Sequence, residues 1–587
     1  MVAVLATVAL VYWPLHLAGF VWVDKICFHD EAWLRSGDAW KHLIFHGFYE
    51  WLIYFRPLVV ALFAFEVRMM GGTPGPMHLV SLGLHLANIV LVGSLAMRLR
   101  GDRPATRADR LRAGLAMLLF GLHPAMVEPV SWISCQFEIV VTFFVLAGLR
   151  LHASSLPPTP RAIAVASCFF LAACSKESAV SFLPLLLLQD WMLRERQQPG
   201  ETIAAILRDL WRDRGGTYAL VFAAGLVYLV LRRESLGFLL TPDGHESLLT
   251  FARFQTVCYV YLTYWRILVW PMAGLSPLHV VDEHRFAAVN VASLGIDLAA
   301  LVLFAAAFVL ALRRRSIGAV LLAVTLALLP VLHIIPVGFD PSLYHERYAM
   351  TALAVACPWL VQAWDELANV QAWKRWKQAA AAVLAAAWFG LAILNIRVTL
   401  PLWSNELLLW QWVLQEDPHS IVATAHLLSS YMNVGDYHHA RALADRVVDE
   451  RLPCKNCLSN AAFIYLAAGN QERAAMVIDR IGRLPGLTRD NDLLESYVLA
   501  LGQLRQLRND FAGAEQAYQD AMSLHPFDPQ PAMQLAFLYA QLNREGEGRK
   551  ALARAQELSP PADRIWRRHR FDEALARTAR SRATPVR

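Results

Sequence analysis

Charged residues are scarce in this sequence. They make up 17% of its 587 positions, whereas 56% of the positions are hydrophobic. Soluble globular domains carry about 25% charged residues. The shortage therefore excludes a single soluble domain as the whole molecule. It is confined to the first two thirds of the chain, because the last third has an ordinary soluble composition. Long apolar runs in the first part predict membrane helices, and the change in composition predicts two domains.

Several signatures of known chemistry are also missing. The sequence has no phosphate-binding P-loop, no dinucleotide-binding glycine pattern and no zinc-protease helix. Of its eight cysteines, most stand singly in apolar runs, where we expect buried thiols. Cys454 and Cys457 lie instead in a polar turn. A local disulfide in an oxidising compartment is the favoured interpretation of this pair, since two thiols alone make a poor zinc site.

The apolar runs predict a polytopic α-helical membrane domain with about eleven spans. The candidate spans are 2–22, 77–98, 112–124, 137–152, 161–174, 177–193, 217–231, 291–312, 318–337, 348–365 and 379–398. The first of them has no basic flank and no small-residue cleavage site, so we expect it to be a retained helix rather than a signal peptide.

Basic loops predict the orientation of these spans. Arg and Lys cluster at 98–112, 194–214, 313–315 and 374–377, and such loops stay in the cytoplasm. Two apolar stretches, 57–70 and 254–270, then become re-entrant or interfacial helices on the outer side. The N-terminus lies inside and the C-terminal part outside. Because much of the net charge of +6 sits in these loops, it argues for membrane topology and against nucleic-acid binding.

Ionisable residues also collect in the outer loops, although polar groups are costly near the membrane core. We therefore expect one shared cavity at the outer face. Asp24, Asp30 and Glu31 follow the first span. They are candidates for a base that deprotonates an acceptor hydroxyl, or for ligands of a divalent metal. A solvated loop with ordinary acids is the alternative.

Cations in three further loops are candidates for binding a phosphate. Arg56 opens an apolar helix, Lys176 interrupts two apolar helices, and Arg347 precedes a later span. As alternatives, Arg56 extends to lipid headgroups and Lys176 pairs with a neighbouring acid. His123 is a further candidate for binding the phosphate. The remaining candidates at the outer face are Glu128, Glu138, Glu177, Glu346 and Tyr348.

A turn pattern recurs in the last third of the chain. It reads Gly435-Asp436, Gly469-Asn470, Asn509-Asp510 and, more weakly, Asn543-Arg544, at separations of 34, 40 and 34 residues by subtraction. Small residues follow the turns at Ala440, Ala474, Ala514 and Gly548. A period near 34 is typical of tetratricopeptide repeats, whose stacked helix pairs leave a groove for a peptide or protein. An unrelated helical bundle is the alternative.

The polar motifs also occur in a familiar order. The residues are Asp30, Arg56-Pro57-Leu58, His78, His85, Asn88, His123-Pro124, Glu128, Trp132, Ser175-Lys176-Glu177, Pro184, Asp190 and Glu346-Arg347-Tyr348, followed by the repeats. With this order the chain resembles the transmembrane, tetratricopeptide-containing O-mannosyltransferases and their bacterial relatives. These enzymes belong to the GT-C class of membrane glycosyltransferases. The resemblance covers nearly the whole chain.

The resemblance implies an inverting transfer of a sugar from a polyprenyl-phosphate donor to an acceptor hydroxyl, usually of Ser or Thr, on the outer face. An acid after the first span acts as the base, and cations hold the donor phosphate. The implied partners are the lipid-linked donor, membrane lipids, and an acceptor protein or glycan carrier in the repeat groove. Composition rich in Ala and Arg, without a eukaryotic retention signal, favours a bacterial inner membrane with periplasmic repeats.

Two departures from the family pattern stand out. The family has two adjacent Asp after the first span, where this chain has His29-Asp30 or, in another alignment, Val23-Asp24. Asp30 is therefore the first candidate base and Asp24 the second, with Glu31 assisting. The family also has an Arg-Lys-Asp run where Gln136-Phe137-Glu138 stand here.

The domains expected from these patterns are a GT-C-like membrane domain at 1–398, tetratricopeptide repeats at 399–562 and a basic tail at 563–587. The competing hypothesis is a non-catalytic membrane scaffold whose repeats assemble an envelope complex. It accounts for the altered acidic pair and the missing cations. The sequence leaves the sugar, the acceptor and any metal requirement open.

Overall fold

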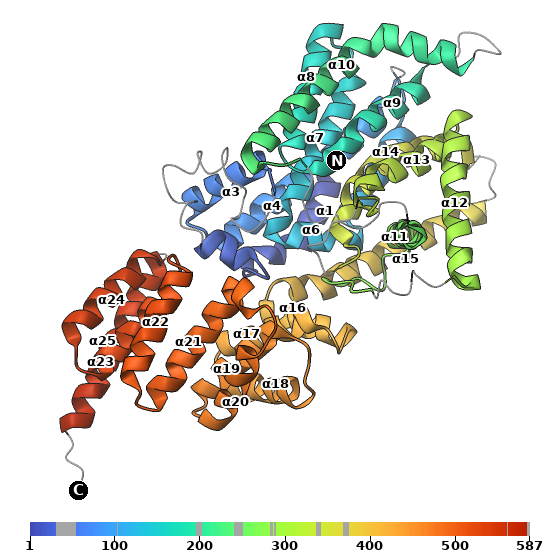
Figure 1. Cartoon of the computed structure of the whole chain (residues 1–587). Coiled ribbons are helices and arrows are strands. Elements are labelled where there is room, and N and C mark those ends of the chain that lie inside the picture. The colour runs from blue at the N-terminus through green and yellow to red at the C-terminus, as the bar shows by residue number, and fades with distance from the viewer. Residues whose placement is uncertain are drawn as a thin grey trace. The chain divides into compact units, whose positions relative to one another are not determined.

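A computed structural model (Figure 1) describes residues 1–30, 34, 54–101, 104–194, 202–239, 250–281, 286, 289–335, 342–367, 375–559 and 561–583. Throughout these ranges the regular structure is helical and contains no strand, which confirms the predicted mainly α class. The chain divides into two compact units. Residues 1–24 and 33–405 form the first, and residues 25–32 and 406–587 form the second.

The first unit contains most of the apolar helices. They are α1 (Val2–Tyr12), α3 (Pro57–Met70), α4 (Pro74–Arg98), α5 (Arg107–Gly121), α6 (Val127–Ser131), α7 (Gln136–His152), α8 (Pro158–Ala173), α9 (Phe182–Leu193), α10 (Ile203–Leu236), α11 (Phe251–Val269), α12 (Val291–Leu312), α13 (Ser316–Leu328), α14 (Ala349–Leu367) and α15 (Arg375–Thr399). Short turns of other helix types are η1 (Trp13–Leu17), η4 (Pro124–Met126), η5 (Ile133–Cys135), η6 (Glu177–Ser181), η8 (Leu329–Val331), η9 (Glu346–Tyr348) and η11 (Leu400–Trp403).

Each apolar run that the sequence nominates as a span or outer-side helix overlaps a helix in the structure, although runs such as 2–22 extend beyond the helical residues. Within the described ranges, five helices are long and apolar enough to cross a membrane, and the bent pair α5 and η4–α6 would make a sixth. They contain α4, α7, α10, α12 and α15. Three further apolar helical stretches, around α1, α8 and α13, are shorter. The expected number of eleven spans therefore stays a prediction.

Helix α7 forms the centre of the first unit. It packs against α4, α8 and α14, and 72% of its apolar stretch is buried. By contrast, only 22% of the apolar stretch of α12 and 11% of that of α15 are buried. Water would solvate such wide apolar faces poorly, whereas lipid tails would cover them at no cost. The exposed faces of α12 and α15 are thus suited to lipid.

The second unit is a run of helix pairs, ordered along the chain as the yellow to red part of Figure 1. Its helices are α16 (Glu406–Glu416), α17 (Ile421–Asn433), α18 (Tyr437–Asp449), α19 (Lys455–Ala467), α20 (Gln471–Gly482), α21 (Asn491–Leu507), α22 (Phe511–Leu524), α23 (Pro529–Gln541), α24 (Glu545–Glu557) and α25 (Pro561–Ala583). The short turn η12 (Leu487–Arg489) precedes α21, and the segment 25–32 contains the π-helical turn η2 (Lys25–Asp30).

The recurring turns of the sequence are the links within these pairs. Gly435, Gly469, Asn509 and Asn543 all have positive φ, between 60° and 76°. Glycine and asparagine tolerate this left-handed conformation best. In the first three turns the next residue, Asp436, Asn470 or Asp510, caps the second helix by accepting a backbone N–H with its side chain. The local turn chemistry read from the sequence is therefore confirmed.

A Tyr–acid–Arg contact recurs between successive pairs. Tyr465 donates to Asp445 at 2.7 Å, and Arg473 contacts the same carboxylate. Two pairs later, Tyr539 donates to Glu515 at 2.8 Å, and Arg544 also lies 2.8 Å from that carboxylate. Each contact joins the second helix of one pair to the next pair. Half-exposed ion pairs contribute about 0–1 kcal/mol, so these contacts set register more than stability.

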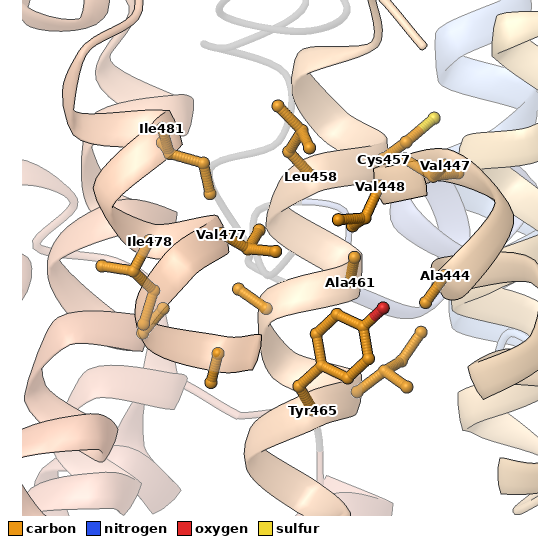
Figure 2. Packing of buried hydrophobic residues seen from close by; sticks show 14 of the residues in the cluster. Ala444, Val447, Val448, Cys457, Leu458, Ala461, Tyr465, Val477, Ile478 and Ile481 are labelled. Carbon is orange, nitrogen blue, oxygen red and sulfur yellow. The ribbon is translucent and has the colours of Figure 1, made fainter. Parts of the chain in front are cut away.

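Small and branched side chains fill the space between the pairs. Figure 2 shows Val447, Ala461, Tyr465 and Val477 converging from α18, α19 and α20, all with no exposed surface. The predicted disulfide between Cys454 and Cys457 lies at the start of α19, where both residues are buried. It is confirmed as a local bridge within one turn.

Helix α25 contains most of the residues that the sequence sets apart as a basic tail. It packs against α23 and α24, and its Phe571 is fully buried in their apolar cluster. The arginines of this segment thus stand on a helix that covers the end of the stack, as terminal helices of stacked repeats do.

Gly502 offers a test of this packing. A Cβ there would lie 2.7 Å from the ring of Tyr518, which has no exposed surface. We expect Gly502→Ala to destabilise the second unit by about 1–3 kcal/mol through overpacking. Thermal unfolding of the purified full chain would measure this, with Gly546→Ala as the control, because nothing lies within 4 Å of its Cβ position. An unchanged melting temperature in Gly502→Ala would contradict the packing described.

Candidate functional site

Two arginines bind one carboxylate in the first unit. Arg56 donates to Glu177 with Nε at 3.0 Å and Nη2 at 2.8 Å, and Arg232 reaches the other oxygen at 2.8 Å. Burial by itself would raise the pKa of Glu177, but the two guanidinium groups outweigh it and hold this pKa at about 2. Glu177 is therefore a carboxylate at every physiological pH.

The backbone brings Arg56 to this position. Pro57 starts α3 because its fixed φ suits the first helical residue, and Arg56 is thereby left outside the helix. The backbone N–H of Leu58 then donates to the carbonyl of Cys174 at 3.1 Å. This bond fastens the Arg56 segment beside the link between α8 and η6, where Lys176 and Glu177 lie.

Lys176 is the centre of the cationic cluster. It pairs with Glu138 from the first turn of α7, and its Nζ lies 4.2 Å above the ring of Tyr348. Burial lowers the pKa of Lys176 well below its usual range, and the charges of Arg56 and Arg347 lower it further. Three cations from three distant loops thus lie within electrostatic reach of one another. This arrangement is unfavourable unless negative charge is close.

Arg347 completes the cluster. Its guanidinium pairs with Glu128 of α6, and its backbone N–H donates to the same carboxylate at 2.8 Å. The guanidinium also lies 5.1 Å above the ring of Trp132. Six segments therefore contribute to the cluster, namely the start of α3, α6, the first turn of α7, the α8–η6 link, the end of α10 and η9.

Asp24 lies beside the same helix α7. Its Oδ1 accepts from the hydroxyl of Ser134 at 2.5 Å and from the backbone N–H of Ser134 at 3.0 Å. No donor among the described residues reaches its Oδ2. Burial raises the pKa of Asp24 to about 7, although the bonds from Ser134 oppose the shift. Ser134, which binds Asp24, and Glu138, which binds Lys176, are only four residues apart. Asp24 and Lys176 are therefore held by neighbouring turns of the same segment.

An aromatic stack precedes Asp24 in the chain. Trp22 stacks on Trp132 with ring centroids 4.6 Å apart, and Trp132 stacks in turn on Trp403 at 6.1 Å. Trp22 has φ of 56°, a conformation that bulky residues rarely adopt. The packing of its ring against Trp132 offsets this strain and positions the acid two residues later.

Residues 136–138, where the sequence departs from the family pattern, each make a contact in the structure. Gln136 donates to Glu66 at 3.2 Å and to Ser81 at 3.1 Å, which ties α7 to α3 and α4. Phe137 lies under the guanidinium of Arg56 at 4.9 Å. Glu138 binds Lys176. Where the family that the motifs resemble has two cations, this chain has an amide contact and an aromatic surface for Arg56.

Several residues of the sequence motifs contact other parts of the first unit. Both ring nitrogens of His123 are engaged by backbone groups, at Leu268 and Ala125, and the accepting Nδ1 implies a neutral ring. Glu346 accepts from His279 at 2.7 Å and from the backbone of Ser276. His78, His85 and Asn88 all contact backbone carbonyls, and Asp190 contacts His152 and Tyr218.

Two candidate acids lie outside the part of the chain that the structure describes, and two residues of the site were not predicted from the sequence. The side chain of Asp30 and all of Glu31 are outside the described part of the chain. Arg232 was not predicted as a site residue. It follows the apolar run 217–231 directly, just as Arg56 directly precedes an apolar run, and this position at the end of a run could have indicated it. Ser134 was not predicted either, because its contact with Asp24 spans 110 residues and leaves no mark in local pattern.

No group of three or more metal-ligating side chains occurs among the residues that the structure describes. The charged cluster can instead bind an anion. Four basic side chains, Arg56, Lys176, Arg232 and Arg347, pair here with three acidic ones, Glu128, Glu138 and Glu177. A phosphate that enters can exchange with these carboxylates and gain charge-assisted bonds from several cations at once.

Comparison with known proteins identifies no relative, because no protein-family model matches the chain and no curated protein matches it. The case for function therefore depends on the chemistry of the cluster and on the resemblance of its motifs.

Buried pairing within the cluster can be tested by a double mutant. Glu128 and Arg347 have side chains only 3% and 11% exposed. Glu128→Leu leaves the guanidinium without its carboxylate, and we expect a loss of about 3–5 kcal/mol. The double variant Glu128→Leu/Arg347→Met removes both charges and should recover much of this loss. Thermal unfolding in detergent measures both, and a double variant less stable than the single one would contradict the pairing.

Proposed function

We propose that this protein is a GT-C-type inverting glycosyltransferase of a membrane. In this proposal it transfers a sugar from a polyprenyl-phosphate-linked donor to an acceptor hydroxyl, most simply of protein Ser or Thr, on the outer face. The observation that carries the proposal is the convergence of cations from three distant loops. Lys176 and Arg347 lie 4.2 and 4.8 Å from the ring centroid of Tyr348. Arg56 lies over the ring of Phe137, the residue before the Glu138 that binds Lys176. Such a cluster is suited to the phosphate of a lipid-linked donor.

The proposed reaction needs three groups. A carboxylate removes the proton of the acceptor hydroxyl as its oxygen bonds to the anomeric carbon of the sugar. The bond from that carbon to the donor phosphate oxygen breaks, and its electrons leave with the polyprenyl phosphate. Cations that meet the phosphate stabilise the charge that develops on this leaving group. Arg56, Lys176 and Arg347 take this role, and Arg232 joins them through Glu177.

Asp24 is the base that the described residues support best. No donor within the described ranges reaches its Oδ2, its pKa is about 7, and Ser134 fixes the other oxygen. A carboxylate whose pKa lies near the working pH combines adequate basicity with a large ionised fraction. Asp30 remains the alternative that the family resemblance favours, with Glu31 beside it, and these acids are also the place for any divalent metal.

The membrane setting and the repeats complete the proposal. We propose about eleven spans in a bacterial inner membrane, with tetratricopeptide repeats on the periplasmic side that recruit the acceptor. The lipid-suited faces of α12 and α15 support membrane insertion. The four helix pairs with left-handed turns support the repeat assignment. The disulfide supports an oxidising compartment.

A membrane scaffold without catalysis is the second candidate. One observation favours it, because each cation of the cluster is already paired with a carboxylate from the chain. In a scaffold, these pairs would only hold loops together. The two functions differ in what the charges are needed for once the fold is intact.

A transfer assay separates the two functions. Membranes with matched expression would be supplied with radiolabelled polyprenyl-phosphate sugars, and incorporation into endogenous acceptors would be followed. We expect Lys176→Met to lose about 10²–10³-fold in rate, as for a lost charge-stabilising group. Lys455→Met, half-exposed in the second unit, is the control and should be fully active. A scaffold would show no incorporation above background for any donor sugar, even in the unmodified protein.

The pH dependence of transfer distinguishes the two candidate bases. Asp24 acts as a base only when deprotonated, so a pKa near 7 makes the rate rise with pH and level off above about 8. Asp24→Asn should then abolish the rise together with most of the activity. If Asp30 is the base with an ordinary pKa of about 4, the rate is flat from pH 6 to 8. In that case Asp30→Asn is inactive and Asp24→Asn is active.

A further inference from the structure

A cavity of about 750 Å³ opens on the second unit, along the first helices of successive pairs. Its apolar part comes from Met432 of α17, Phe463 of α19 and Leu499 of α21. Its volume lies within the usual range for ligand sites in proteins. Since α17, α19, α21 and α23 all contribute, the cavity follows the direction in which the pairs stack.

Glutamines line the far part of the cavity. They are Gln503, Gln506, Gln530, Gln534 and Gln541. A primary amide offers both donors and acceptors, which is what the N–H and C=O groups of an extended polypeptide require. The side chains of Gln506 in α21 and Gln541 in α23 form a hydrogen bond of 2.7 Å. This bond connects the two helices at this part of the cavity wall.

The acid Glu495 lies at this cavity with an unsatisfied oxygen. Its side chain lines the cavity, the residue is only 8% exposed, and no donor among the described residues contacts its Oε1. The charged groups that act on it most are two further acids, Asp528 and Asp492. Together with burial, these acids raise the pKa of Glu495 to about 8. Asp492 contacts His525 at 3.1 Å, while Glu495 shares a side-chain hydrogen bond with Asp528 and keeps an Oε1 that no donor among the described residues reaches.

A buried acid among other acids is costly unless a cation or proton reaches it. The geometry points to an extended polypeptide segment as the occupant of this cavity, with a Lys or Arg side chain that reaches Glu495 and Asp528 and apolar neighbours that cover Phe463 and Leu499. The cation would supply the missing donor to Oε1, and the glutamines would bind the backbone. A neutral glycan would satisfy the amides but would leave the acids unpaired.

This occupancy does not depend on catalysis. The further statement, that the bound segment belongs to the acceptor of sugar transfer, rests on the proposed function. Such binding would let the enzyme select its acceptor protein by a segment other than the modified residue. Binding is therefore measured without any sugar donor, so that its failure and a failure of transfer are separate results.

The experiment uses the full chain in detergent micelles and fluorescent decapeptide libraries. The central position is fixed as Arg, Lys or Gln, and the others are drawn from apolar and small residues. Fluorescence polarisation should show tighter binding of the Arg and Lys libraries than of the Gln library. Glu495→Gln should weaken the cationic libraries by at least about tenfold, the factor expected for a lost charged hydrogen bond, and should leave the Gln library unchanged.

Matched controls make the result decisive. Glu472→Gln, an exposed acid of α20 outside the cavity, should bind as the unmodified protein does. Glu495→Gln is isosteric and replaces the buried carboxyl group by an amide, and its thermal unfolding checks that the fold is kept. Leu499→Gln, in the apolar part, should weaken all three libraries. Equal affinity for the three libraries, no binding, or an unchanged affinity in Glu495→Gln overturns the inference. Binding of a neutral oligosaccharide that Leu499→Gln abolishes, without peptide binding, assigns the cavity to glycan instead.

Discussion

Charge buried at the ends of apolar helices is the constraint on which the first unit depends. An isolated ion in such a place costs several kcal/mol, so each one requires a partner. Glu177 is held by Arg56 and Arg232, which join the start of α3 and the end of α10 to the link after α8. Lys176, next in the chain, then pairs with α7, and Arg347 pairs with α6. These pairs bring together segments up to 219 residues apart in sequence.

The two units carry opposite imbalances of buried charge. In the cluster of the first unit, the charges of Arg56 and Arg347 both act on the buried Lys176. The cavity of the second unit has acids that act on one another and a carboxylate oxygen that no donor in the described part of the chain reaches. An anion relieves the first imbalance and a cation the second. The same electrostatic reasoning thus leads to a phosphate ligand for one unit and a basic segment for the other.

Local features could be predicted from the sequence, and distant contacts could not. The turns at Gly435, Gly469 and Asn509 follow from residues that tolerate positive φ, and the cysteine bridge follows from two thiols in one turn. Helix positions follow from apolar runs. The pairing of Arg232 with Glu177 was not predictable, because nothing near either residue encodes the other. Likewise His123 matches the family motif, yet its ring is occupied by backbone groups that no local pattern reveals.

Binding of the donor lipid is the most direct test of the central claim, that the cluster holds a lipid phosphate. Thermal unfolding of the purified chain would be measured with undecaprenyl phosphate and with undecaprenol, which has the same chain and no phosphate. The account predicts that the phosphate lipid raises the melting temperature, because a ligand stabilises the state that binds it, and that the alcohol does not. The shift should vanish in Lys176→Met. Equal shifts from both lipids, or an unchanged shift in Lys176→Met, would contradict the account.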